Sequence, residues 1–168
     1  MLSLSHTWEE EEVSQQELWV GSEETRSKVG YLKIQCACEI AQWTNIRYMR
    51  IDTCCIDKKS SAELSEAINS MFRWYRNARV CHVHLSDVAA TEVVGHTYGS
   101  EQFIASQWFT RGWTLQEVIV PERLLFFNSQ WQHIGSVDDF LSGIVKATTI
   151  DHVSVSYTHL TLPTKRIV

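Results

Sequence analysis

IRYMRIDTCCIDKKSSAELSEAINSMFRWYRNARVCHVHL, residues 46–85, contains a complete strand–helix–strand pattern. Ile46 to Ile51 favours a strand, and a loop follows from residue 53 to 60. Ser60 and Glu63 have the spacing of a helical capping box, which predicts a helix that runs to about Arg76. The alternating residues 79–85 then predict a second strand. Two strands joined by a helix lie parallel in one sheet, so this stretch indicates an α/β fold.

The segments on either side extend the same alternation. We expect strands at 2–5 and 124–127, helices at 24–43 and 137–147 (N-cap Ser136), short helices at 103–108 and 113–119, and a long loop at 86–100. This order predicts one parallel sheet with flanking helices. Ligands of such sheets bind at the carboxyl ends of the strands, which selects the loops 6–12, 52–58 and 86–117.

The composition of the 168 residues limits the classes of function. Apolar residues make up 44% of the chain and seven Trp are present, so a folded core is expected. The formal charge of −5 and the lack of a basic run argue against a nucleic-acid partner. The chain has no apolar stretch long enough to span a membrane and no secretory signal. Five Cys, an odd number, favour a reducing cytoplasmic setting.

The chain divides unequally. We expect one domain at residues 1–150, truncated from a longer protein, and a tail at 151–168 of doubtful origin that is disordered. The tail does not continue the pattern of strands and helices. Two origins stay open, namely a natural tail and read-through at an artefactual gene end.

Cysteine and histidine chemistry receives little support from the spacing. Cys36 and Cys38 lie two apart on a predicted helix and so point in different directions. His82 and His84 share one face of a strand, but no further ligand suggests itself, so we expect no metal site. A catalytic thiol at Cys54 or Cys55 is a minor alternative. Neither a Walker-type phosphate loop nor a GxGxxG motif occurs.

The carboxylates near predicted loops are better candidates. Asp52 and Asp57 flank the loop after one strand, and Glu117 lies on a short helix near Arg111 and Trp113. A carboxylate beside apolar rings loses solvation, which suits general acid/base or cation-stabilising chemistry. Arg111 could instead hold an anionic ligand. From residue types alone, a structural ion pair between Arg111 and an Asp or Glu is the favoured interpretation.

At these residues the chain resembles the fungal heterokaryon-incompatibility (HET) domain. The segments that resemble successive signature blocks of that family are Leu4–Trp8, Ile51–Lys58, Ser61–Phe72 and Trp108–Glu117, in the same order and at similar spacing. The resemblance implies a death-inducing signalling module in fungal non-self recognition, programmed cell death and innate immunity. It implies as partners further copies of the chain or other cell-death signalling proteins.

The HET family is thought to be distantly similar to TIR domains, which implies a flavodoxin/TIR-like parallel sheet with flanking helices. The segment Trp113–Glu117 is similar to the TIR stretch that carries the glutamate of NAD cleavage. By that likeness Glu117 is the catalytic candidate of a TIR-like NAD glycohydrolase, the alternative function. The ligand-binding candidates are Ser5, His6, Trp8, Asp52, Asp57, Arg111, Trp113 and Gln116. We expect no bound cofactor, and NAD as a possible substrate. A folded but inert gene remnant is the third interpretation.

Overall fold

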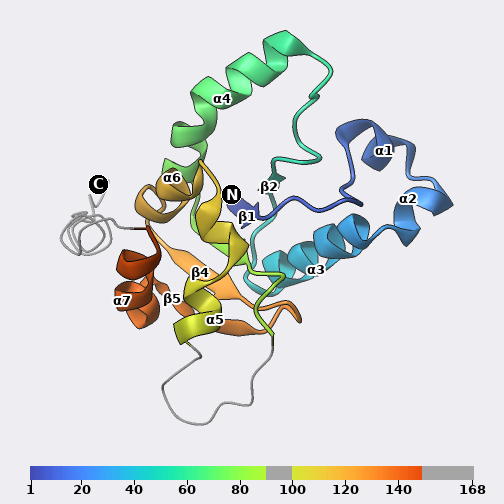
Figure 1. Ribbon diagram of the computed structural model, residues 1–168. Coiled ribbons are helices and arrows are strands. Elements are labelled where there is room, and N and C mark those ends of the chain that lie inside the picture. The colour runs from blue at the N-terminus through green and yellow to red at the C-terminus, as the bar shows by residue number, and fades with distance from the viewer. Residues whose placement is uncertain (90–99, 149–168) are drawn as a thin grey trace.

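The computed structural model describes residues 1–89 and 100–148, and these form a five-stranded sheet covered by helices (Figure 1). The strand order is β2-β1-β3-β4-β5. The strands are β1 (Leu2–His6), β2 (Met49–Ile51), β3 (Val80–His84), β4 (Leu124–Phe127) and β5 (His133–Ser136). β1 to β4 are parallel to their neighbours, and β5 is antiparallel to β4. The predicted α/β class is confirmed, and the order 2-1-3-4-5 is that of flavodoxin-like sheets.

The central strands are buried along their whole length because helices cover both faces. Every residue of β1 and of β3 is buried. The helices are α1 (Gln15–Val20), α2 (Glu23–Ser27), α3 (Val29–Trp43), α4 (Ser61–Arg76), α5 (Ser100–Ile104), the 3-10 helix η1 (Gln107–Thr110), α6 (Thr114–Ile119) and α7 (Val137–Thr148). Phe103, Trp108 and Phe126 belong to the largest apolar cluster, and Leu4 packs near Ala37 of α3 in a separate one. Buried parallel strands of this kind hold their carboxyl ends in fixed positions.

Three predicted elements differ from the observed ones. The strand expected at 46–51 begins only at Met49, because Asn45 has a left-handed φ of 55° that turns the chain out of α3. The helix expected at 24–43 is two helices, since Lys28 is extended with ψ of 144°. The short helix expected at 103–108 is replaced by α5, which ends at Ile104, and by η1.

Two elements were not predicted, and each depends on local chemistry. α1 begins at Ser14, whose hydroxyl accepts a hydrogen bond from the Glu17 backbone N–H in a complete capping box. β5 is the antiparallel edge strand, and it contains Gly135 at φ 155°. Alternation over so short a strand is too weak to distinguish it from a loop. The loop expected at 86–100 falls mostly outside the described residues, as does the tail at 151–168.

The helix that supports the candidate site begins as its sequence predicts. The Ser60 hydroxyl accepts a hydrogen bond from the Glu63 backbone N–H at 3.2 Å, which confirms the N-cap. The Glu63 carboxylate, however, accepts from the Asp57 backbone N–H at 2.9 Å rather than from Ser60. This bond ties the loop after β2 to the first turn of α4.

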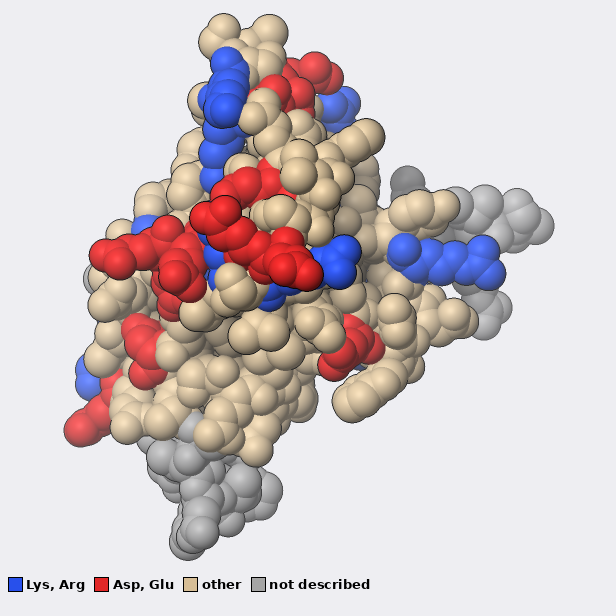
Figure 2. Space-filling model, turned by 90° about the vertical axis from the view of Figure 1, so that its right-hand side faces the viewer, with Lys and Arg blue, Asp and Glu red and all other residues tan. Residues whose placement is uncertain are grey.

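The surface carries its charges in mixed groups. On the face shown in Figure 2, Asp and Glu side chains gather in a band and Lys and Arg side chains lie dispersed around them. Among the described residues, no helix has the length and hydropathy needed to cross a bilayer.

Candidate functional site

A cavity of about 480 Å³ lies beyond the carboxyl ends of β1 and β2, in the size range of small-molecule sites. Thr7 and Trp8 reach it from the loop after β1, and Asp52 reaches it from the loop after β2. α4 supplies an apolar wall, and the segment around α6 supplies Arg111, Trp113 and Glu117. The apolar lining consists of Ile56, Leu64, Ala67, Ile68 and Met71. Described residues from each of the three predicted loops, 6–12, 52–58 and 86–117, therefore line one cavity.

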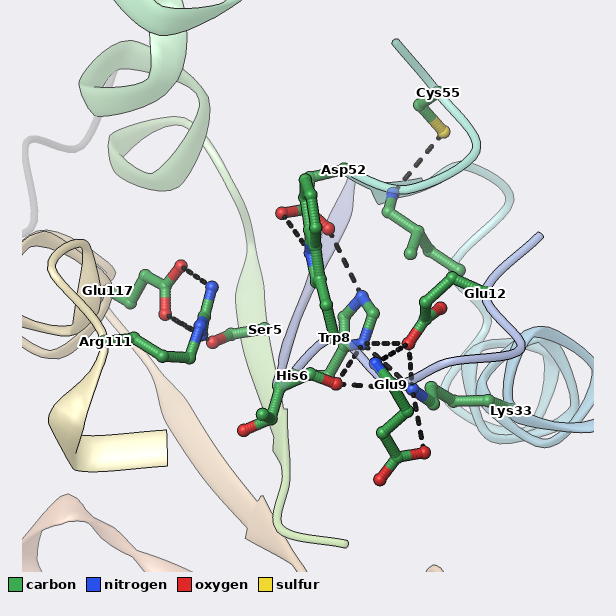
Figure 3. Close-up of polar contacts among 12 residues, drawn as sticks. Ser5, His6, Trp8, Glu9, Glu12, Lys33, Asp52, Cys55, Arg111 and Glu117 are labelled. Carbon is green, nitrogen blue, oxygen red and sulfur yellow. Dashed lines mark hydrogen bonds and ion pairs between the residues drawn. The ribbon is translucent and has the colours of Figure 1, made fainter. Parts of the chain in front are cut away.

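Glu117 is the most firmly held carboxylate of the cavity. Glu117 is only 1% exposed, although it belongs to the cavity lining. Arg111 donates through Nη1 to Oε2 at 2.9 Å and through Nη2 to Oε1 at 3.2 Å (Figure 3). Ser5 donates to Oε2 at 2.6 Å, and the Tyr75 hydroxyl donates to Oε1 at 3.1 Å. The structural ion pair weighed from the sequence is thus present, with Glu117 as the partner of Arg111.

The donors around Glu117 come from separate parts of the chain. Ser5 lies on β1 and itself accepts a hydrogen bond from the Trp108 Nε1–H at 2.7 Å. Tyr75 lies near the end of α4, and burial together with the charge of Glu117 raises the pKa of its hydroxyl well above the ordinary value. Tyr75 therefore stays a neutral donor. A carboxylate offers about four lone-pair positions, so these donors occupy its acceptor capacity.

Asp52 is the second carboxylate, and its bonds leave it accessible. Its side chain is 16% exposed. The His6 Nε2 lies 3.2 Å from Oδ1, and the Trp8 Nε1–H donates to Oδ2 at 3.0 Å. Burial raises the pKa of Asp52, but the hydrogen bond and charge of His6, the charge of Arg111 and the bond from Trp8 outweigh it, so the pKa lies below its ordinary value. Asp52 is therefore an ionised group at the cavity wall.

His6 connects Asp52 to a buried cation behind the cavity. Its Nδ1 lies 3.2 Å from the Nζ of Lys33, which is 5% exposed on α3. Lys33 also pairs with Glu12 and, at 3.6 Å, with Glu9 (Figure 3). The two ring nitrogens of His6 thus face two different partners, with Nδ1 toward Lys33 and Nε2 toward Asp52. The acidic run 9–12 is a loop, and two of its carboxylates, those of Glu9 and Glu12, balance the charge of Lys33.

Two tryptophan rings of the cavity have cationic side chains among their neighbours in the lining. Trp8 is 50% exposed, and the Lys58 ammonium lies 3.4 Å above the centre of its ring. Trp113 is 41% exposed and lines the cavity next to Gly112. Exposed indole rings beside Lys58 and Arg111 can stack a flat ring while the cations bind an anionic group. Trp8, Lys58, Arg111 and Trp113 therefore line one cavity together.

Two predicted ligand-binding residues lie elsewhere. The Asp57 carboxylate accepts from the Lys59 backbone N–H at 2.9 Å, and it is not part of the cavity lining. Gln116 also lies outside the lining, and its buried Oε1 has no hydrogen-bond partner among the described residues. The structure therefore gathers Ser5, Trp8, Asp52, Arg111, Trp113 and Glu117 at the cavity or directly behind it, with His6 behind Asp52.

Sequence reasoning missed three participants. Tyr75 was not singled out, although a buried tyrosine hydroxyl usually needs a polar partner. Lys33 lies within a predicted helix, and no motif in the neighbouring sequence marks it as part of a site. Lys58 falls at the end of a selected loop but was not singled out. His82 and His84 are buried, with ring nitrogens that have no hydrogen-bond partner among the described residues. Within those residues no group of three or more His, Cys, Asp and Glu has a metal-binding arrangement.

These features define an α/β domain with a flavodoxin-like strand order and a small-molecule cavity at the carboxyl edge of its sheet. The model of the heterokaryon incompatibility protein (HET) family matches residues 2–98. The chain is also 47% identical over 136 residues to the vegetative incompatibility protein HET-E-1 of Podospora anserina. The chain belongs to the heterokaryon-incompatibility family.

The matched regions cover only part of each protein, which limits what they show about the cavity. The match to HET-E-1 covers 79% of this chain but only 10% of that relative. The family match ends before Trp108, so the segment that carries Arg111 and Glu117 lies beyond it. The search of solved structures returned no match. The family is therefore established by sequence, and the geometry of the cavity is the main source of information on Glu117.

Proposed function

We propose that this chain is a death-inducing signalling module of fungal non-self recognition. The observation that carries the proposal is the 47% identity with a vegetative incompatibility protein over most of the chain. Incompatibility requires a signal that turns recognition into an effect on the cell. A domain with a ligand-sized cavity and an internal network of ionised groups is suited to that task.

Expression of the full chain in a filamentous fungus, from an inducible promoter, tests this role. We expect growth arrest and uptake of a vital dye in induced cells. Glu117→Ala should abolish killing, because it removes the acceptor that joins Arg111, Ser5 and Tyr75. Glu122→Ala, an exposed Glu close in sequence, is the matched control and should kill normally. Normal growth of cells that accumulate the folded wild-type chain would refute the proposal.

As the second candidate function we propose a TIR-like NAD glycohydrolase that uses Glu117. In support, the Glu117 carboxylate, two exposed indole rings and two cations share one cavity. Cleavage of the nicotinamide–ribose bond develops oxocarbenium character, which a carboxylate stabilises. The rings of Trp8 and Trp113 could stack a nicotinamide or adenine, and Arg111 and Lys58 could bind the diphosphate.

The ion pair between Arg111 and Glu117 must open before Glu117 can take part in NAD cleavage. Because Glu117 accepts from Arg111 through both oxygens, it can approach a substrate cation only after Arg111 releases it. Arg111 is 18% exposed in its side chain, whereas the other donors are buried, so Arg111 is the group that can turn. A diphosphate that binds Arg111 would free Glu117 at the moment of substrate binding.

Chromatography of NAD incubated with the purified chain separates the two functions. If the domain is a glycohydrolase, nicotinamide accumulates with the wild type, and Glu117→Gln lowers the rate at least about a hundredfold, as for loss of one electrostatic transition-state group. Glu122→Gln should be unchanged. No nicotinamide from a chain that still kills cells would exclude the enzyme and leave the signalling module.

We further propose that the chain acts in the cytoplasm and associates with further copies of itself or with other cell-death signalling proteins. In support, α4 exposes Leu64, Ile68 and Phe72, which are spaced by one helical turn, and the first two of them stand at the larger cavity. Sedimentation of the wild type and of Phe72→Glu tests self-association. A monomer at all concentrations for both proteins would contradict it.

A further inference from the structure

A second cavity, of about 240 Å³, lies beside the same loop that carries Asp52. Its walls come from α1, α3, β2 and the segment between α3 and β2. The lining is mainly aliphatic, with Leu18, Ile34, Ala41, Ile46, Met49 and Ile51. Asp52 and Ile56 of the loop line the larger cavity, whereas Cys54 and Cys55 line this smaller one. One short loop therefore separates the two cavities.

Three thiols meet at the smaller cavity. Cys38 of α3 is half-buried, Cys54 is buried and Cys55 is exposed, and all three belong to its lining. They do not form a metal-binding arrangement with the other described residues. Cys55 is thus the most exposed thiol of this group, and it lies beside an apolar cavity.

The surroundings of Cys55 favour its thiolate. The neighbouring Cys54 thiol is the largest of the influences that lower the pKa of Cys55 to about 6, although burial opposes them. The Ile51 backbone N–H donates to Sγ at 3.4 Å (Figure 3), and the positive charge of Arg50 acts in the same direction. The same pairing raises the pKa of Cys54. Accessible thiolates near donors and cations are the reactive cysteines of proteins.

We propose that Cys55 is a covalent modification site for small apolar α,β-unsaturated carbonyl compounds, which the aliphatic cavity beside it admits. The Cys55 thiolate attacks the β-carbon of the compound, so that a C–S bond forms and the C=C π bond breaks. The electron pair moves to the carbonyl as an enolate, and water protonates its α-carbon. The product is a thioether, and no oxidant or reductant takes part.

Cys36 provides an internal control for reactivity. It is a half-buried thiol on α3, outside the cavity lining, and burial raises its pKa. At pH 6, about half of Cys55 is thiolate, against roughly 0.3% of a thiol with an ordinary pKa. Because the nucleophilicity of a thiolate falls with its pKa, this advantage shrinks to about tenfold in rate.

The test is the alkylation of the full-length chain at pH 6 with cyclohexenone, followed by peptide mass mapping over time. We expect Cys55 to be modified about tenfold faster than Cys36 or more, with a rate that rises through pH 6 and then levels off. Hydrophilic acrylamide, which gains nothing from an aliphatic cavity, should show a several-fold smaller preference for Cys55 over Cys36.

Three results would overturn the proposal. Modification of Cys36 as fast as Cys55 would show that Cys55 is not activated. An equal preference with acrylamide and cyclohexenone would show that the cavity does not select the reagent. In Cys55→Ser, the rapid phase should disappear while Cys36 reacts at its original rate, and a persisting rapid phase would place the reactivity elsewhere. The rates for the wild-type chain decide the question even if Cys55→Ser does not fold.

Discussion

The two carboxylates of the larger cavity differ in how they are held. Glu117 is 1% exposed and accepts from Arg111, Ser5 and Tyr75, whereas the 16% exposed Asp52 side chain accepts from two ring N–H groups, of His6 and Trp8. The hydrogen bonds of Glu117 join β1, α4 and the segment around α6. The difference indicates that Glu117 contributes mostly to the folded structure, while Asp52 keeps acceptor capacity for a ligand.

The two carboxylates are therefore not equally available for the proposed TIR-like chemistry. If Glu117 is the reactive group, as the proposed TIR-like activity requires, its bonds to Arg111 must first be broken. Asp52 needs no such release, and the Lys33–His6 chain behind it can keep it ionised. If the cavity acts on a ligand, the two carboxylates have different tasks, which variants at each can separate.

The largest expected effect is that of Glu117→Ala on stability. The change leaves the mostly buried Arg111 charge without its partner and removes the acceptor of Ser5 and Tyr75. Loss of one member of a buried ion pair destabilises a protein by about 3–5 kcal/mol, and the partial exposure of Arg111 favours the lower end. Urea unfolding measures the free energy of unfolding.

The double variant Glu117→Ala with Arg111→Met is the control for this first prediction. Because it leaves no unpaired cation, it should regain part of the lost stability. A loss below about 1 kcal/mol for Glu117→Ala alone would mean that the network is not structural, and the contrast with Asp52 would disappear.

An intermediate effect on stability is expected for Trp108→Phe. This variant tests the hydrogen bond from Trp108 to Ser5, the residue that donates to Glu117. Trp108 is fully buried, and its Nε1–H donates to the Ser5 hydroxyl. The smaller ring keeps the apolar packing in part but leaves a gap and removes the donor, so we expect a loss of roughly 1–3 kcal/mol. Trp113→Phe, at an exposed ring, is the matched control. Equal losses for the two variants would contradict the prediction.

The smallest effect is expected for Asp52→Asn, and its pH dependence sharpens the comparison. The pKa of Asp52 is lowered in the folded chain, so the stability it contributes is present above the ordinary pKa of about 4 and is lost as the pH falls through the folded value. We expect a loss of about 1 kcal/mol that stays constant between pH 7 and pH 5.

Two histidines provide the background for that measurement. Burial lowers the pKa of His82 and of His84 to about 4, so the unfolded chain binds protons first as the pH drops below about 6.5. Both the wild type and Asp52→Asn should therefore lose stability in parallel from about pH 6.5 to pH 5. A difference between them that widens over this range would show that Asp52 is not ionised there.

The elements that could be predicted from the sequence are those whose stabilising interactions join residues close together in the chain. The strands at 79–85 and 124–127, the helix from Ser60 to Arg76 and the parallel order were read from local periodicity and one N-cap. The same signals failed at α1 and β5, which are short elements that depend on a capping box and on pairing with β4. The loops at the cavity were predictable because parallel strands end on one edge.

The sequence by itself determined the family, the α/β class and the loops that meet at the strand ends, because these depend on residue patterns that lie close together in the chain. Only the tertiary structure decided which groups touch. Ser5 and Glu117 are 112 residues apart, and His6 and Asp52 are 46 apart. A hydrogen bond needs its two atoms placed within a few tenths of an ångström, and that placement arises from the packing of whole helices on the sheet. Thus Glu117 and an ion pair of Arg111 with a carboxylate could be named from the sequence, but the hydrogen bonds that Ser5 and Tyr75 donate to Glu117 could not.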